Sequence, residues 1–593
     1  MSTSTGVSAG DRNIAIGILN RRLTHVALRS ILDVVQNRGQ RRGGKSVEWI
    51  VVEAEQPAYA PGRLRTKLPN DEVAALLVDL CGPDLLSISE LRFHLALECP
   101  PDELDTLHEY QSSSRGRGGT KSQAEAIAAR RWRPGGSWPS HFVRTLGFPP
   151  VFAGLPGDPK EPDFVIVEPF IPLPPLQDFQ SELLHKALKV VAAKAGENRA
   201  ILTLPTGAGK TRTAVETLLQ WRLECDQQRG ILWIAQSEEL CEQAVQSFRE
   251  VWIDQGHRSS ARRNPMTVTR LWGGRRTIPA LPDVIVASIQ QLYSIVTAKE
   301  TDEEEALECR TALGLIAKQL GVVIVDEAHR MLASSYVEVL TFIGVDPVRT
   351  SPLPLLGLTA TPYRSDDGET RRLVKRFHGN LLAPENLGPD PIGSLRSRGV
   401  LSQPVHKIVT VDGPELSIDD DPKFKEHFEQ FNDFHPELLK QLGQDKARNK
   451  RLLEILRELP KDWPTLFFAC SLEHARAIAV LLRRQNRAAA VVAGETRSAT
   501  RRFLIEEFRS GKISVLCNYG VLTTGFDAPK VRALVIARPT ASVVLYEQMI
   551  GRGMRGRVFG GTDECFVVDV ADNIRFGGQL AFNRYSDHWD RIR

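Results

Sequence analysis

Short, predominantly apolar runs separated by amphipathic segments constrain this chain more than any other feature. Between residues 176 and 365 they lie at 200–204, 231–235, 284–287, 322–325 and 355–358. After residue 400 the pattern restarts, with runs at 465–468, 489–492, 514–516, 533–536 and 565–568. Strands that are apolar throughout, with helices between them, are typical of parallel sheets covered on both faces. The sequence therefore predicts an α/β fold with two doubly wound parallel-sheet lobes in tandem.

Composition and proline content suggest how the rest of the chain is divided. A Pro-rich segment should be extended, because proline fixes the backbone and lacks an N–H donor. Before it we expect a strand at 48–53 and helices over 71–110. We interpret the acidic run 302–305 as a solvated loop or helix start. The predicted parts are 1–155, a mixed α+β N-terminal accessory domain that binds DNA or a partner; 156–175, a linker; 176–365, lobe 1; 366–400, a connector; and 401–593, lobe 2.

Bulk composition excludes several classes of protein. Hydrophobic residues make up 42% and charged residues 25% of the chain, as in ordinary soluble proteins. No run of about 18 to 20 apolar residues is present, so we predict no membrane span, and no signal peptide is evident. The eight cysteines form no C-x-x-C pair or zinc pattern, which favours free thiols in the cytoplasm. The net charge of +4 permits nucleic-acid binding without requiring it.

A glycine-rich turn follows the first apolar run and precedes a helical segment. In that position a loop directs backbone N–H groups at phosphates, and the helix N-terminus adds a positive dipole end. Lys210 would contact the β- and γ-phosphates, and the Thr211 hydroxyl would ligate Mg²⁺. The strict motif has glycine where this chain has Leu204. We predict that ATP or GTP binds to Thr206, Gly207, Ala208, Gly209, Lys210 and Thr211.

Two carboxylates follow the apolar run 322–325. Asp326 and Glu327 would face the ligand crevice of an open α/β sheet, because that crevice lies beyond the carboxyl ends of the strands. We expect Asp326 to hold Mg²⁺ and Glu327 to position and polarise the attacking water.

With these motifs in order, the chain resembles a superfamily 2 helicase of the DEAH type over about 175–575, which implies two RecA-like lobes. Gln180, at the end of 176–180, resembles the glutamine that reads the adenine edge, which implies ATP rather than GTP. The segments 234–243 and 283–290 resemble motifs that touch the nucleic-acid backbone, and 359–362 resembles motif III. The resemblance implies nucleic-acid contact or coupling roles for Gln243, Ser288, Gln290, His329, Thr359 and Thr361.

The second lobe completes the family pattern. Residues 467–471 resemble motif IV, and 522–529 resemble motif V, which implies nucleotide contacts for Gly525 and Asp527 and a coupling role for Thr524. Residues 548–555 fit motif VI. Its polar residues are three to four positions apart, so we expect them on one helix face that crosses to the γ-phosphate. These residues are Gln548, Arg552 and Arg555.

The spans 520–556 and 567–573 are most similar to the RadD-like group and to the motor subunits of type I and type III restriction systems. This likeness implies an ATP-dependent DNA helicase or translocase, in antiphage defence or DNA repair. The N-terminal region shows no nuclease constellation, so a cutting activity would belong to a separate effector subunit. Two alternatives stay open: an RNA helicase of the DExH kind, and an ATP-gated DNA sensor or scaffold that recruits an effector nuclease.

Residues 130–133 join arginines to a tryptophan. This combination suits phosphate contact with base stacking. The alternative is a solvated helix end with a packed tryptophan.

Overall fold

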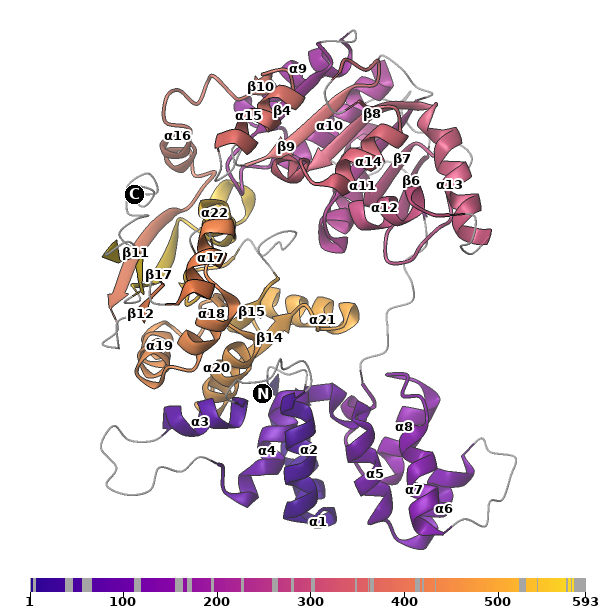
Figure 1. Ribbon diagram of the computed structural model, residues 1–593, viewed down its shortest axis with the longest axis vertical. Coiled ribbons are helices and arrows are strands. Elements are labelled where there is room, and N and C mark those ends of the chain that lie inside the picture. Colours follow the sequence, from indigo (N-terminus) through magenta and orange to yellow (C-terminus); the bar gives the residue numbers. More distant parts are fainter. Residues whose placement is uncertain are drawn as a thin grey trace.

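A helical N-terminal part and two α/β lobes follow one another along the chain (Figure 1). The computed structural model describes residues 2–580 except for 4–6, 38–45, 56–66, 111–118, 155–163, 168–172, 194–196, 225–228, 259–264, 279–281, 300–303, 347–348, 361, 363–366, 411–415, 419–420, 432, 522–529, 541, 572–573 and 577–578. None of the described helices combines the length and apolarity needed to cross a bilayer.

The N-terminal part, residues 2–154, is called the N-domain below. Its described residues are mostly helical, where the sequence predicted a mixed α+β domain; the described strands in it are β1 (Ser2–Thr3) and β2 (Val7–Ser8). The helices expected over 71–110 are present. The helices are α1 (Ala9–Arg22), α2 (His25–Asn37), α3 (Val47–Glu55), α4 (Asn70–Cys81), α5 (Ser89–Leu97), α6 (Pro101–Glu109), α7 (Thr120–Ala129) and α8 (Ser137–Thr145), with 3-10 turns η1 (Gly82–Ser87) and η2 (Pro150–Ala153).

The strand predicted at 48–53 is wrong, because these residues belong to helix α3. Its β-branched residues favour a strand in isolation. However, Val47, Ile50 and Val51 have helical spacing and are at most 1% exposed. Helix α3 contacts α19 and α20 of the second lobe, and these side chains join that lobe's apolar core. Burying each of them contributes roughly 1.5 to 3 kcal/mol, which outweighs the local strand preference.

Lobe 1 is an eight-stranded sheet in the order β10-β4-β9-β8-β5-β7-β6-β3, parallel except for β3. Strand β3 lies within the predicted linker 156–175, and β10 lies within the predicted connector 366–400, so both segments contribute to lobe 1. The strands are β3 (Phe164–Val167), β4 (Arg199–Thr203), β5 (Gly230–Ala235), β6 (Met266–Leu271), β7 (Val284–Ser288), β8 (Leu320–Asp326), β9 (Leu355–Thr359) and β10 (Leu381–Leu382); the helices are α9 (Asp178–Val191), α10 (Lys210–Glu224), α11 (Glu238–Arg258), α12 (Ile289–Val296), α13 (Glu304–Ala317), α14 (Ser334–Phe342) and α15 (Asp367–Arg376), with the 3-10 turn η4 (Ala328–Arg330).

Lobe 2 is a six-stranded parallel sheet in the order β11-β17-β16-β13-β15-β14. The prediction of two tandem doubly wound lobes is therefore confirmed. The strands of lobe 2 are β11 (Gln403–Thr410), β13 (Thr465–Phe468), β14 (Ala489–Ala493), β15 (Val515–Tyr519), β16 (Ala533–Ile536) and β17 (Glu564–Ala571). The helices of lobe 2 are α17 (Pro422–Phe431), α18 (Pro436–Gly443), α19 (Lys446–Glu458), α20 (Leu472–Arg484), α21 (Ser498–Arg509) and α22 (Val543–Ile550), with the 3-10 turn η5 (Arg557–Phe559). Helix α16 (Pro391–Ser397) precedes β11, and β12 (Leu416–Ser417), β18 (Ile574–Phe576) and β19 (Gln579–Leu580) form a separate three-stranded sheet.

Two of the residues at 130–133, Arg130 and Trp132, serve packing. The Arg130 guanidinium donates to the carbonyls of Leu107, His108 and Tyr110 at the end of α6. Trp132 lies beneath the guanidinium of Arg92, 5.0 Å from the ring centroid. These contacts match the packed-tryptophan alternative rather than base stacking.

Candidate active site

The glycine-rich turn lies between β4 and α10, at the carboxyl edge of the first sheet. Gly207 and Gly209 have φ of +89° and +84°, values that residues with a Cβ rarely adopt. Ala208 is buried and its N–H donates to the Pro205 carbonyl at 3.1 Å, which tightens the turn. Helix α10 begins at Lys210, so its free N–H groups and dipole face the turn. This geometry is suited to cradling phosphates.

The two acidic residues stand at the end of β8. In the sheet, β9 separates β8 from β4, and the carboxyl ends of these parallel strands lie at the same sheet edge. Asp326 is 4% exposed, and burial raises its pKa to about 6, although the nearby charge of Lys210 opposes the shift. Burial would also raise the pKa of Glu327, but the charges of Lys210, His329 and Arg552 outweigh burial and lower it. Glu327 is therefore held as a carboxylate among cations.

Backbone conformation and a histidine fix the position of Glu327. Its φ of +52° is unusual for a residue with a side chain and costs of order 1–3 kcal/mol. The Oε2 atom of Glu327 lies 3.3 Å from Nδ1 of His329. That same nitrogen lies 3.1 Å from Oγ1 of Thr359, which is fully buried at the end of β9. A polar chain thus runs from Glu327 to Thr359.

Lobe 2 meets the glycine-rich turn through the residues after α22. A Cβ on Gly551 would lie 2.3 Å from Cγ2 of Thr206, so the two lobes touch there. A Cβ on Gly207 would lie 3.6 Å from Cγ of Arg555. The charge of Arg552 reaches Glu327, as its effect on the carboxylate shows. The site is therefore composite, with both lobes contributing.

The prediction that Gln548, Arg552 and Arg555 share one helix face is wrong. Helix α22 ends at Ile550, and Arg555 forms a β-bridge with Leu401. Glycines explain the break, because the chain at 551–561 passes too close to its surroundings for side chains; a Cβ on Gly553 would lie 2.3 Å from the Cys565 sulfur. Gln548 is buried within α22, while both arginines sit beyond it.

Gln180 is tied to the glycine-rich turn. Its Nε2 donates to the Ala208 carbonyl at 3.1 Å, and its Oε1 accepts from the Gln177 N–H at 2.9 Å. The side chain is 1% exposed. To read an adenine edge, as the resemblance implies, the Gln180 side chain would have to replace these two hydrogen bonds with hydrogen bonds to the base.

An open groove of about 630 Å³ runs between the lobes and is called the inter-lobe groove. Ser288 and Gln290, predicted from the resemblance, line it, and Gln243 is not among its lining residues.

Thr361, Thr524, Gly525 and Asp527 lie outside the described residues. Sequence reasoning missed Arg497 and Arg501, although the Gly-Glu-Thr-Arg run after a lobe 2 strand was a signal for a strand-end loop. The lining residues are 236–239, 273–274, 288, 290–291, 494–497 and 501.

The donor set fits a magnesium nucleotide. Mg²⁺ prefers one or two protein oxygens together with substrate phosphates rather than a cage made of protein alone. Thr211 offers a hydroxyl in the first turn of α10, and Asp326 offers a carboxylate at the end of β8. Across the described ranges no group of three or more His, Cys, Asp or Glu residues could hold a metal.

Two family models match the lobes. The model described as "Type III restriction enzyme, res subunit" matches residues 173–364, and the one described as "Helicase conserved C-terminal domain" matches 447–557. The whole N-domain and the segment 365–446 lie outside both matches.

Curated relatives match over the same region. The putative mitochondrial ATP-dependent helicase irc3 of Schizosaccharomyces pombe is 26% identical over 414 residues, covering 68% of this chain and 58% of that protein. The putative ATP-dependent helicase IRC3 of Saccharomyces cerevisiae is 23% identical, covering 67% of this chain and 51% of that protein. A type I restriction enzyme EcoAI endonuclease subunit of Escherichia coli is 26% identical over 32% of this chain and 20% of its own length. The chain thus spans little more than half the length of the two helicases.

Proposed function

Because this chain is a superfamily 2 helicase related to restriction-enzyme motor subunits, we propose that it hydrolyses ATP to move on or remodel DNA. The observation that carries the proposal is the composite site. Gly551 of lobe 2 touches Thr206 of the turn, and the charge of Arg552 acts on Glu327. Such a site is complete only when the lobes are together, so ATP binding and release would be linked to lobe motion.

Each residue of the composite site has a role in this proposal. Lys210 and the N–H groups of the turn bind the phosphates, and Thr211 and Asp326 hold Mg²⁺, which neutralises developing charge when bound. Glu327 orients the attacking water, and its lowered pKa keeps it ionised for that task. Arg552 and Arg555 stabilise charge on the transferred phosphoryl group.

Coupling to the nucleic acid is proposed to run through His329 and Thr359. The chain of contacts from Glu327 to Thr359 crosses from the end of β8 to the end of β9. A shift at the carboxylate on hydrolysis would therefore move the edge of the sheet. The inter-lobe groove is the proposed binding site of the polynucleotide.

DNA is proposed over RNA on the likeness to restriction subunits. That likeness also supports a separate nuclease or other effector subunit, and a role in antiphage defence or DNA repair. The described cysteines are free thiols, which supports a reducing compartment such as the cytoplasm.

The test is steady-state ATPase activity of the full chain, alone and with duplex, single-stranded or forked DNA or with RNA. Lys210→Ala, which should lose nucleotide binding, is the blank. Stimulation by DNA above RNA supports the proposal. Stimulation by RNA alone identifies an RNA helicase. ATPase activity indifferent to every polynucleotide, with no stepping on DNA, would favour the sensor that recruits an effector.

A further inference from the structure

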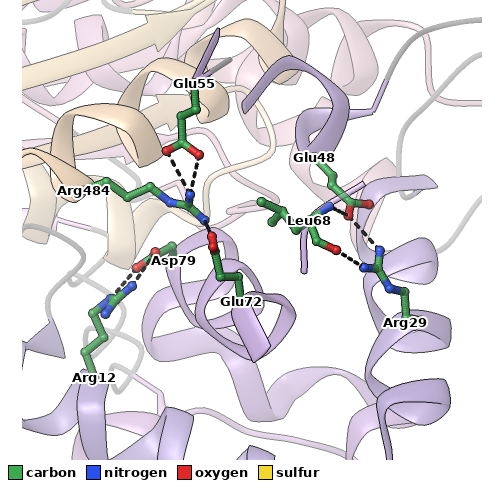
Figure 2. Close-up of polar contacts among 8 residues, drawn as sticks. All are labelled: Arg12, Arg29, Glu48, Glu55, Leu68, Glu72, Asp79 and Arg484. Atoms are coloured by element: carbon green, nitrogen blue, oxygen red, sulfur yellow. Dashed lines mark hydrogen bonds and ion pairs between the residues drawn. The ribbon is translucent and has the colours of Figure 1, made fainter. Parts of the chain in front are cut away.

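The N-domain is fixed to lobe 2. Arg484 of α20 forms ion pairs with Glu55 at 2.8 Å and Glu72 at 3.1 Å (Figure 2). Arg483 donates to the Asp79 carbonyl at 2.8 Å, and the Asp79 carboxylate is itself held by Arg12 at 2.7 Å. One apolar core joins the N-domain helices to α19 and α20. The end of α4 and the turn η1 therefore have a set position beside lobe 2.

A cleft of about 340 Å³, called the N-domain cleft, lies between the N-domain and lobe 2. Residues 79–84 line it on one side and residues of lobe 2 line it on the other. Glu495, Thr496 and Arg497 line this cleft and also line the inter-lobe groove. The two spaces therefore meet at the loop between β14 and α21. A polynucleotide lying in the groove would pass next to the N-domain.

Arg497 stands at this junction and pairs with a residue of the N-domain. Its Nη2 lies 2.5 Å from Oδ1 of Asp84, which belongs to η1. The side chains are 45% and 30% exposed, so solvent reaches the pair. Arg501, the other arginine lining the groove, is used differently: it donates to the carbonyls of residues 493, 494 and 496 and pairs with Glu239 of lobe 1. Arg501 thus shapes the loop, while Arg497 can turn without disturbing it.

We propose that Asp84 competes with a backbone phosphate for Arg497, so that the N-domain restrains nucleic-acid binding in the inter-lobe groove. The guanidinium group binds carboxylate and phosphate with the same forked geometry, so one can replace the other. A solvent-exposed pair of this kind is weak enough to be exchanged. Asp84 cannot follow Arg497 into the groove, because its turn is fixed on lobe 2. The inference rests on the proposed function, since it assumes that nucleic acid occupies this groove.

The test measures binding of a fluorescent single-stranded DNA to the full chain over a series of salt concentrations. Asp84→Asn removes the competitor and should bind about 1.5- to 5-fold more tightly. Arg497→Gln removes the phosphate contact, so the slope of log K against log salt should become shallower by about 0.7. Adding Asp84→Asn to Arg497→Gln should give no further gain, because the competition acts through Arg497.

Glu72→Gln is the matched control, because it neutralises another N-domain carboxylate that pairs with lobe 2 but lines neither space. It should bind DNA as the wild type does, and thermal melting checks that each variant is folded. A folded Asp84→Asn variant with wild-type affinity overturns the competition alone. A gain that persists without Arg497 also overturns it, since simple charge repulsion would then suffice. A wild-type chain that binds no polynucleotide overturns the proposed function together with this inference.

Discussion

Gly551 lets the two lobes close on the glycine-rich turn, and a single methyl group should prevent it. In Gly551→Ala the new Cβ would lie 2.3 Å from Cγ2 and 2.5 Å from Cβ of Thr206. Carbon atoms in contact prefer about 3.5–4.0 Å, so the lobes must separate by roughly 1 Å or more. The backbone φ of −55° suits alanine, so the change acts through the contact and not through the backbone.

The separation should reduce turnover more than it reduces stability. Arg552 acts on Glu327 across this contact, and a displacement of about 1 Å in an active site can cost on the order of 10²-fold in rate. The assay is kcat and KM for ATP at a saturating concentration of the stimulating polynucleotide. Gly17→Ala is the control, because a Cβ there meets nothing within 4 Å. Turnover of Gly551→Ala within about twofold of wild type would refute the reasoning.

Three further changes test the roles of single groups. Glu327→Gln should bind ATP but lose about 10²-fold or more in hydrolysis rate, because the amide cannot polarise water; near-normal turnover would contradict its role. Arg552→Ala should bind ATP yet lose about 10³-fold in kcat, whereas Arg557→Ala, whose side chain is 74% exposed, should behave as wild type. Burial raises the pKa of Asp326 to about 6, so its ionised form destabilises the nucleotide-free fold increasingly as pH rises through that value. Asp326→Asn should therefore raise the free energy of unfolding by roughly 1–3 kcal/mol at pH 8 and by less at pH 5, and a lower melting temperature at pH 8 would contradict this.

Much of the site could be placed from local sequence because its residues follow strand ends. The runs before Thr206 and Asp326 are apolar except for Thr203, and parallel strands align their carboxyl ends at one sheet edge. Because of this alignment, the sequence predicts that the glycine-rich turn and the two carboxylates lie at the same sheet edge. The expected helix through Arg552 and Arg555 failed, because glycines at 551 and 553 are required by close contacts from other parts of the chain. The spacing of residues in the sequence does not indicate those contacts, because they involve parts of the chain that are distant in sequence.

The sequence by itself determined the two α/β lobes, their order and the positions of the phosphate-binding turn and the acidic residues, since apolar periodicity and glycine content are local properties. Only the tertiary structure decided the rest. Helix α3 replaces a predicted strand because its apolar face is buried against α19 and α20. The segments predicted to connect the domains supply β3 and β10 because a sheet edge offers them hydrogen bonds. The pairing of Arg497 with Asp84 joins residues more than 400 positions apart, and only the packing of the N-domain on lobe 2 brings them together.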